Sequence, residues 1–140
     1  MPHLKRFLAR AQAQGVMVAL GTDTPFPHLI PGFSVHDELC MYVDAGVRPV
    51  DALRAATTVN AQVLGMGERV GQLRAGWVAD IIAVQGNPLA CIDQISQIEQ
   101  VMHAGQLFTP AALLPVVQRT FAQTPDDAIT KDLLRYVNRE

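Results

Sequence analysis

The chain has 140 residues, of which 49% are hydrophobic and 17% are charged, and its formal net charge is −2. This length fits one globular domain, and the composition excludes an intrinsically disordered chain. The small net charge excludes an electrostatic footprint for nucleic acid, and every apolar run is shorter than the roughly 20 residues of a membrane span. Cys40 and Cys91 fit neither a disulfide framework nor a C-x-x-C zinc site. We therefore expect a cytoplasmic protein without a nucleic-acid or membrane partner.

The first element in chain order is an amphipathic helix over residues 2–14, which Gly15 is placed to end. The run 16–20 follows at once, and five consecutive apolar residues are typical of a strand buried on both faces. Asp23 comes directly after this strand, at its carboxyl end, where α/β folds gather ligands and catalytic groups. The alternative is that Asp23 only begins a turn, because Asp and Gly both favour turns.

A proline-rich loop over residues 24–34 separates this strand from a helical region. Ser34 is placed as the N-cap of a helix that runs to about residue 45. A second helix is expected to begin at Pro49 and to break near residues 57–58, before a third short helix over 59–64. The first of these helices is expected to bury Leu39, Cys40 and Val43.

The second half of the chain changes character. Glycines punctuate residues 67–77, and strands are expected over 79–84, 98–103 and 105–108. The last two strands form a hairpin across Ala104-Gly105, and residues 109–140 return to a helical pattern. One parallel-type strand without a sequence neighbour is unusual for a complete domain. The chain therefore looks like the end of a larger α/β protein.

The four histidines form no H-x-H or H-x-x-x-H pair, so any metal needs ligands from distant positions or from outside this chain. His28 lies in the loop beyond Asp23, where it either contacts a substrate or is simply exposed to solvent. His36 and Glu38 occupy the first turns of a helix, where capping and packing explain them at least as well as catalysis. Asp80 is interpreted as a residue that satisfies turn amides.

Several motifs stand in a fixed order along roughly residues 4–108. They are GVMVALGTDTP at 15–25; PGFSVHDEL at 31–39, AGVRP at 45–49 and ALRAAT at 52–57; and NA at 60–61, LG at 64–65, VGQLRAGWVADII at 70–82, NPL at 87–89 and VMHAG at 101–105. In this order and spacing the chain resembles the C-terminal portion of the metal-dependent amidohydrolase superfamily, in the branch that contains imidazolonepropionases and prolidase-like enzymes. Residues 109–140 carry no part of the resemblance.

The resemblance implies the C-terminal fragment of a (β/α)8 TIM barrel, with strand 8 at about 16–20 and the following helices within residues 1–66. It further implies the C-terminal strands of a small composite β-sandwich domain over 67–108, with 109–140 as a helical tail. The implied activity is hydrolysis of a non-peptide C–N bond in a cyclic amide, amidine or dipeptide-like small molecule. In such enzymes a hydroxide on one or two divalent ions, usually zinc, attacks the substrate.

By position, the resemblance makes Asp23 the metal ligand and proton shuttle, and His28 is the candidate substrate-binding residue. The other metal-site residues of the family, its H-x-H pair, bridging lysine or carboxylate and two later histidines, have no counterpart in this chain. We therefore expect the isolated chain to be inactive and to need the missing N-terminal barrel segment or further copies of itself. The alternatives are a non-catalytic truncated product and a small-ligand binder that uses the loop at 24–34.

Overall fold

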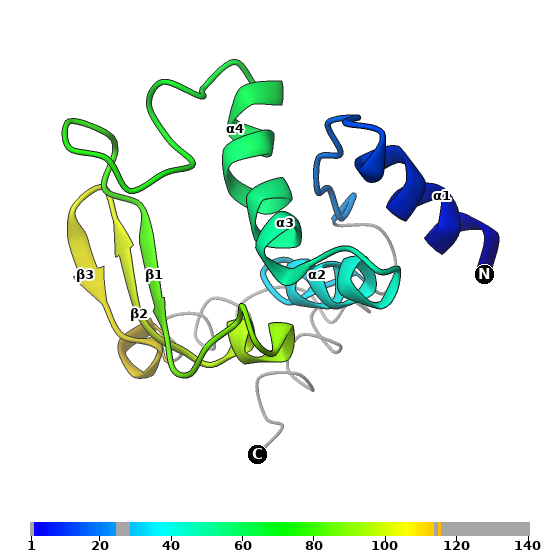
Figure 1. The fold of residues 1–140 in the computed structure, drawn as a ribbon. Coiled ribbons are helices and arrows are strands. Elements are labelled where there is room, and N and C mark those ends of the chain that lie inside the picture. Colours follow the sequence, from blue (N-terminus) through cyan, green and yellow to red (C-terminus); the bar gives the residue numbers. More distant parts are fainter. Residues whose placement is uncertain (1, 25–28, 114, 116–140) are drawn as a thin grey trace.

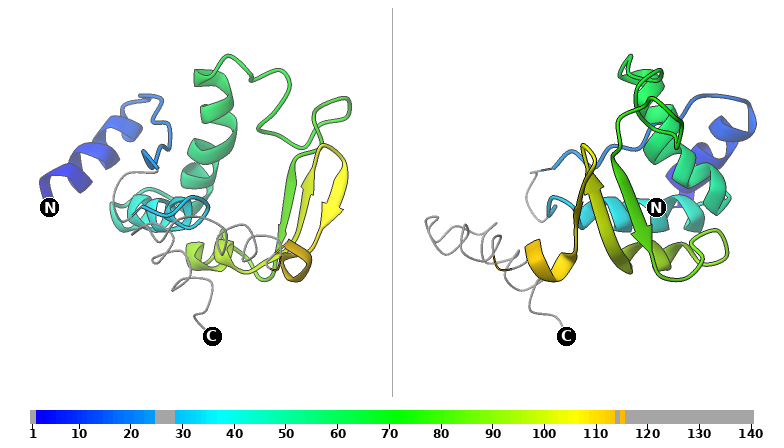
Figure 2. Two further views of the ribbon diagram at one scale, coloured as in Figure 1. Left: turned by 180° about the vertical axis from the view of Figure 1, so that it is seen from behind. Right: turned by 90° about the vertical axis from the view of Figure 1, so that its left-hand side faces the viewer.

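The computed structural model describes residues 2–24, 29–113 and 115. Helix α1 (Pro2–Ala13) forms where the periodicity predicts it. Gly15 adopts a φ of 78°, and the Val16 N–H donates to the Ala11 carbonyl at 3.0 Å, so the helix ends in the predicted glycine cap. Helix α1 and the β-sheet lie at opposite ends of the molecule, with the other helices between them (Figures 1 and 2).

Helix α2 (Ser34–Asp44) has the predicted extent, but the predicted cap is wrong. The N-cap residue is Phe33, and the Ser34 hydroxyl donates instead to the Ile30 carbonyl at 3.0 Å. Ser34 is buried, and this carbonyl satisfies its hydroxyl within the protein. Of the apolar residues expected inside, Leu39 is buried while Cys40 and Val43 are half-buried; Tyr42 takes the remaining place in the core.

Helix α3 (Pro49–Arg54) continues without a break through a π-helical turn, η1 (Ala55–Val59), into α4 (Asn60–Val63). The predicted break at residues 57–58 is therefore wrong. The Thr57 hydroxyl donates to the Leu53 carbonyl at 2.7 Å, and the Thr58 hydroxyl donates to the Gly71 carbonyl at 3.0 Å. Both hydroxyls thus bond to backbone while the helix widens locally and continues.

The chain after α4 passes very close to this helix at Gly71. Gly71 has a φ of 92°, and a Cβ atom placed on it would lie 2.8 Å from the Cβ of Ala61 and 2.9 Å from the backbone carbonyl oxygen of Thr57. Gly76 has a similar φ of 84° but no atom within 4 Å of such a position. Gly71 is therefore required by the close approach as well as by its backbone angle.

Three short strands form one antiparallel sheet in the order β1-β2-β3, namely β1 (Ile81–Val84), β2 (Ile98–His103) and β3 (Gln106–Phe108). Its register pairs Ile82 with Val101 and Met102 with Leu107. The predicted hairpin at Ala104-Gly105 is confirmed, and both residues have positive φ angles of 49° and 82°. Within the described ranges this sheet has no second sheet packed on it, so the strands but not a complete sandwich are present.

Asp80 is placed to stabilise this hairpin. Its Oδ1 accepts a hydrogen bond from the Ala104 amide at 2.8 Å and lies 3.0 Å from Nδ1 of His103. The backbone hydrogen bond from Ala104, and then the contact with His103, hold the pKa of the Asp80 carboxyl below its usual value. The interpretation of Asp80 as a residue that satisfies a turn amide is confirmed.

Residues 16–20, predicted as barrel strand 8, form no strand in this structure. A parallel strand needs hydrogen-bonded neighbours, and within 2–24, 29–113 and 115 no other segment pairs with it. The apolar run is nevertheless partly inside, because Leu20 is 9% exposed and belongs to the core. The predicted burial on both faces is wrong for the described residues, because Val16 and Met17 are 55% and 65% exposed where no strand pairs with this run.

The core lies between α2, α3, the segment 16–20 and a 3-10 helix, η2 (Ile92–Ser96), that packs against α2. Its buried members are Leu20, Leu39, Tyr42, Val47, Ala52, Ala55, Ile92 and Ile95. Two of these residues are alanines, and none of the large side chains described is completely buried. Among the described residues, no helix has both the length and the apolar character needed to cross a bilayer.

Candidate functional site

Asp23, the candidate catalytic residue, is exposed and has an unusual backbone conformation. Its φ is 57°, and among the described non-glycine residues only Ala104 shares a positive φ. Asp adopts this left-handed region more readily than most residues, although at some cost in free energy. Such backbone outliers cluster at functional sites. The conformation therefore marks Asp23 as a specially held residue, without assigning its chemistry.

The residues beside Asp23 form a local turn. The Thr22 and Thr24 hydroxyl oxygens lie 3.1 Å apart and share a hydrogen bond. Within the described part of the chain, the Asp23 carboxylate has no hydrogen-bond partner of its own. Asp23 therefore stands in a turn with an exposed carboxylate that no described residue pairs with, and its role as ligand and proton shuttle stays a prediction.

The backbone just before Asp23 is held by the side chain of Asn60, on α4. The Leu20 N–H donates to Oδ1 of Asn60 at 2.9 Å, and Nδ2 of Asn60 donates to the Leu20 carbonyl at 2.8 Å. The two residues lie 40 positions apart in the chain. The carboxamide thus gives Leu20 both of the hydrogen bonds that a neighbouring strand would provide.

Two side chains of α2 hold the residues on either side of Leu20. The Tyr42 hydroxyl donates to the Ala19 carbonyl at 2.8 Å, and the Gly21 N–H donates to Oε1 of Glu38 at 3.1 Å. Glu38 makes no capping bond at the start of its own helix, so the capping explanation of this residue is wrong. Burial, followed by the nearby Glu38 charge, raises the pKa of the Tyr42 hydroxyl.

A small cavity of about 290 Å³ lies beside this contact, lined by residues that include Gly21, Thr22, Asp37 and Glu38. The second carboxylate oxygen of Glu38, Oε2, is buried and has no hydrogen-bond partner among the described residues. Glu38 is therefore engaged through one oxygen only.

His36 lines a different cavity, of about 330 Å³, with apolar neighbours that include Phe33, Ile98 and Val101. Burial lowers the pKa of its imidazole, with the Asp37 charge opposing the shift. Packing therefore accounts for His36, and no contact brings it to Asp23.

His28, the candidate substrate-binding residue, lies outside the described residues, as do Pro25 and Pro27 of the same loop.

The donor atoms in the described ranges do not suit a metal ion. They contain no group of three or more His, Cys, Asp or Glu side chains arranged to hold one. A structural or catalytic zinc site takes at least three protein ligands. A metal ion bound by Asp23 would therefore need its other ligands from outside the described residues.

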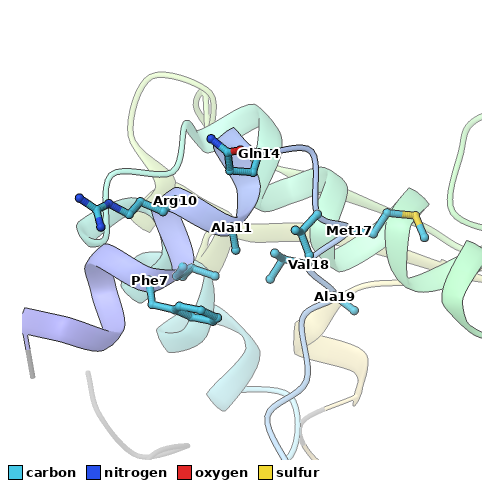
Figure 3. A pocket seen from close by; sticks show the side chains of 9 residues that line it. Phe7, Arg10, Ala11, Gln14, Met17, Val18 and Ala19 are labelled. Carbon is cyan, nitrogen blue, oxygen red and sulfur yellow. The ribbon is translucent and has the colours of Figure 1, made fainter.

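An apolar groove of about 600 Å³ runs between α1 and the segment 16–19. Figure 3 shows Phe7 and Ala11 of the helix on one side and Val18 and Ala19 on the other, with Val18 directed toward the helix. Phe7 is 71% exposed and Met17 is 65% exposed. Exposed apolar side chains gathered along one groove are typical of a surface that packs against another chain or segment.

Comparison with known proteins gives the same assignment from sequence and from structure. A model of the amidohydrolase family matches residues 2–108. The ochratoxinase of Aspergillus niger is 38% identical over 120 residues, which cover 81% of this chain and 23% of that protein. A Xaa-Pro dipeptidase structure with bound methionine superposes with a TM-score of 0.69 at 29% identity, over 77% of this chain and 26% of that one.

A putative prolidase from Bifidobacterium longum gives a TM-score of 0.69 at 28% identity, over 94% of this chain and 30% of that one. Molinate hydrolase shares the fold, at 21% identity and a TM-score of 0.69. The chain thus spans about a quarter of the length of the relatives it matches. The family match over most of its length shows that this chain belongs to the amidohydrolase family.

Proposed function

We propose that this chain is the C-terminal part of an amidohydrolase that hydrolyses a C–N bond in a small dipeptide-like substrate, and that it contributes Asp23 to the reaction. The observation that carries the proposal is the placing of Asp23: an exposed carboxylate in a strained backbone conformation, directly after an anchored apolar segment. Two structural relatives are described as a Xaa-Pro dipeptidase and a putative prolidase. These names favour a dipeptide-like substrate over a cyclic amide or amidine.

The role proposed for Asp23 is proton transfer. A carboxylate beside an attacking water accepts its proton and then returns that proton to the leaving nitrogen. Asp has a short side chain, so a fixed backbone fixes the carboxylate closely. The described residues provide no second acid or base in contact with Asp23, so the rest of the site is proposed to come from the missing part of the barrel.

The groove between α1 and residues 16–19 is proposed as the contact surface for that N-terminal barrel segment. The exposed apolar side chains there include Phe7, Val16 and Met17. The backbone of residues 17 and 18 has no hydrogen bond to another described segment, so it presents an open edge to a pairing strand. A homo-oligomer that covers the same groove is the competing outcome.

The first experiment uses the 140-residue protein alone. Hydrolysis of a Xaa-Pro dipeptide is measured with and without added Zn²⁺, together with metal content and size-exclusion chromatography. We expect no turnover, no retained metal, and a tendency to self-associate. A monodisperse, zinc-loaded protein that hydrolyses the dipeptide would show that the proposal of an incomplete fragment is wrong.

The second experiment restores the barrel. Residues 2–108 replace the matching segment of the Bifidobacterium longum relative, and turnover of the dipeptide is compared for the chimaera and its Asp23→Asn form. We expect the substitution to lower kcat by at least about 100-fold, the size of a lost general acid–base group. The matched control, Glu99→Gln, makes the same chemical change at an exposed strand position and should keep activity. Equal activity of the Asp23→Asn chimaera would refute the role of Asp23.

A further inference from the structure

We propose that Asn60, Glu38 and Tyr42 are positioning residues that form a side-chain clamp on residues 19–21, and that this clamp fixes the backbone from which Asp23 projects. The importance of fixing Asp23 rests on the proposed function, whereas the clamp itself is a property of the described residues. The clamp consists of four hydrogen bonds from α2 and α4 to three consecutive residues.

Asn60 is the central member of the clamp. Its carboxamide presents an acceptor oxygen and an N–H donor side by side on one edge, and both are used on Leu20. Leu20 is 9% exposed, so without Asn60 its amide and carbonyl would lose their protein partners in a largely buried place. Packing alone does not require an Asn here, because an apolar side chain of the same size fills the same volume.

Glu38 and Tyr42 extend the clamp on both sides of Leu20. They are four residues apart on α2, which places them on one face of the helix. Tyr42 bonds to the residue before Leu20 and Glu38 bonds to the residue after it. The buried, unpartnered Oε2 of Glu38 shows that a carboxylate is kept in a place where it is only partly satisfied.

The clamp ends two residues before Asp23. Two residues of extended chain span at most about 7 Å, so fixing Gly21 confines the position of Asp23. The strained φ of 57° at Asp23 also needs a neighbour that is held in place, because a free chain relaxes to a negative φ. In this way helices α2 and α4 replace the strand pairing that the segment lacks here.

The test is made by NMR on the ¹⁵N-labelled 140-residue protein, with no metal and no substrate. Amide hydrogen exchange is measured at Leu20 and Gly21, and the intraresidue NOE between the amide and Hα protons is measured at Asp23. A positive φ brings these two protons close together, so the NOE reports the strained conformation. The variants are Asn60→Leu, Glu38→Ala, Glu38→Gln and, as a matched control at the exposed C-terminal end of α2, Asp44→Ala.

We expect Asn60→Leu to raise the exchange rate of Leu20, and Glu38→Ala that of Gly21, each by at least about tenfold, with a weaker NOE at Asp23. Glu38→Gln keeps an acceptor oxygen and should keep the Gly21 amide protected, and Asp44→Ala should change neither amide. The β2 amides should be unaffected, which separates loss of the clamp from unfolding.

Wild-type Leu20 and Gly21 amides that exchange as in an unstructured peptide would overturn the proposal, even if every variant fails to fold. So would a full NOE at Asp23 in both Asn60→Leu and Glu38→Ala. An intact clamp in a protein whose Asp23→Asn chimaera is fully active would refute the proposed function and leave the clamp standing.

Discussion

Replacing Tyr42 by Phe tests the hydrogen bond to Ala19 without disturbing the core. Tyr42 is 8% exposed, and the ring remains in Phe, so the change removes only the hydroxyl that donates to the Ala19 carbonyl at 2.8 Å. A bond of this kind contributes about 0.5–1.5 kcal/mol. Ala19 is exposed, so water replaces the lost donor and the cost should fall at the low end of that range. We expect Tm to fall by about 2–4 °C at pH 7.

The same variant has a pH dependence that follows from the Tyr42 pKa. Burial and the Glu38 charge raise that pKa in the folded state. The neutral hydroxyl therefore contributes fully below the unfolded pKa of about 10, and this contribution is lost as the pH rises through the higher folded pKa. Phe cannot titrate, so the difference in Tm between wild type and Tyr42→Phe should be constant from pH 6 to 9 and shrink above about pH 10.

Thermal unfolding monitored by circular dichroism at pH 7, 9 and 10.5 measures this difference. Tyr136, the other tyrosine, is present in both proteins and cancels in the comparison. A variant as stable as wild type at pH 7 would refute the stabilising role of the Ala19 bond. A difference that stays constant up to pH 10.5 would refute the coupling between folding and the Tyr42 hydroxyl.

Three further predictions concern other parts of the molecule. Burial, with the nearby Asp93 carboxylate, raises the pKa of the Cys40 thiol to about 11, so about one molecule in a thousand carries the Cys40 thiolate at pH 8. Iodoacetamide should therefore label the exposed Cys91 first, and peptide mass spectrometry measures the order of labelling. Gly71→Ala should lower the free energy of unfolding by about 1–3 kcal/mol more than Gly76→Ala, because both residues have positive φ but only Gly71 lacks room for a Cβ. Urea titration measures the difference, and equal losses in the two variants would contradict the close approach at Gly71. The hydrogen bond from the Ala104 amide to Asp80 should persist above about pH 4 and be lost as the pH falls through the lowered Asp80 pKa. The chemical shift of the Ala104 amide reports this loss, and Asp80→Ala should abolish the pH-dependent change.

The elements that the sequence predicts well are those that depend on neighbouring residues. Helical periodicity and Gly15 define α1, and Ala104-Gly105 defines the hairpin, because each signal lies within a few positions of the structure it produces. The break predicted at residues 57–58 is wrong for the opposite reason. Whether two threonines interrupt a helix depends on partners for their hydroxyls, and one of these partners is the carbonyl of Gly71, in a later loop.

In the candidate site, too, the sequence predicts the features that depend on neighbouring residues and misses those that depend on distant ones. Asp23 is identified from sequence because it ends an apolar run within a family motif, and its strained backbone supports that choice. A strand, however, is a relation between two segments: the sequence shows the run 16–20 without a parallel-type neighbour, and among the described residues no segment pairs with it. Asn60 lies 40 residues from Leu20, and its motif gives no sign of which backbone groups it binds. Long-range bonds between side chains and backbone have no local pattern.

The π turn at Ala55–Val59 determines how the protein responds to a change in the number of residues in this helix. Each residue of a helix advances the next side chain by about 100° around the axis. A π turn bonds each residue to the one five positions on instead of four, so removing one residue from it would return the helix to α bonding and keep Asn60 on the face toward Leu20. A one-residue deletion within residues 55–59 should therefore be tolerated better than a one-residue insertion, which would turn Asn60 away from the segment that carries Asp23.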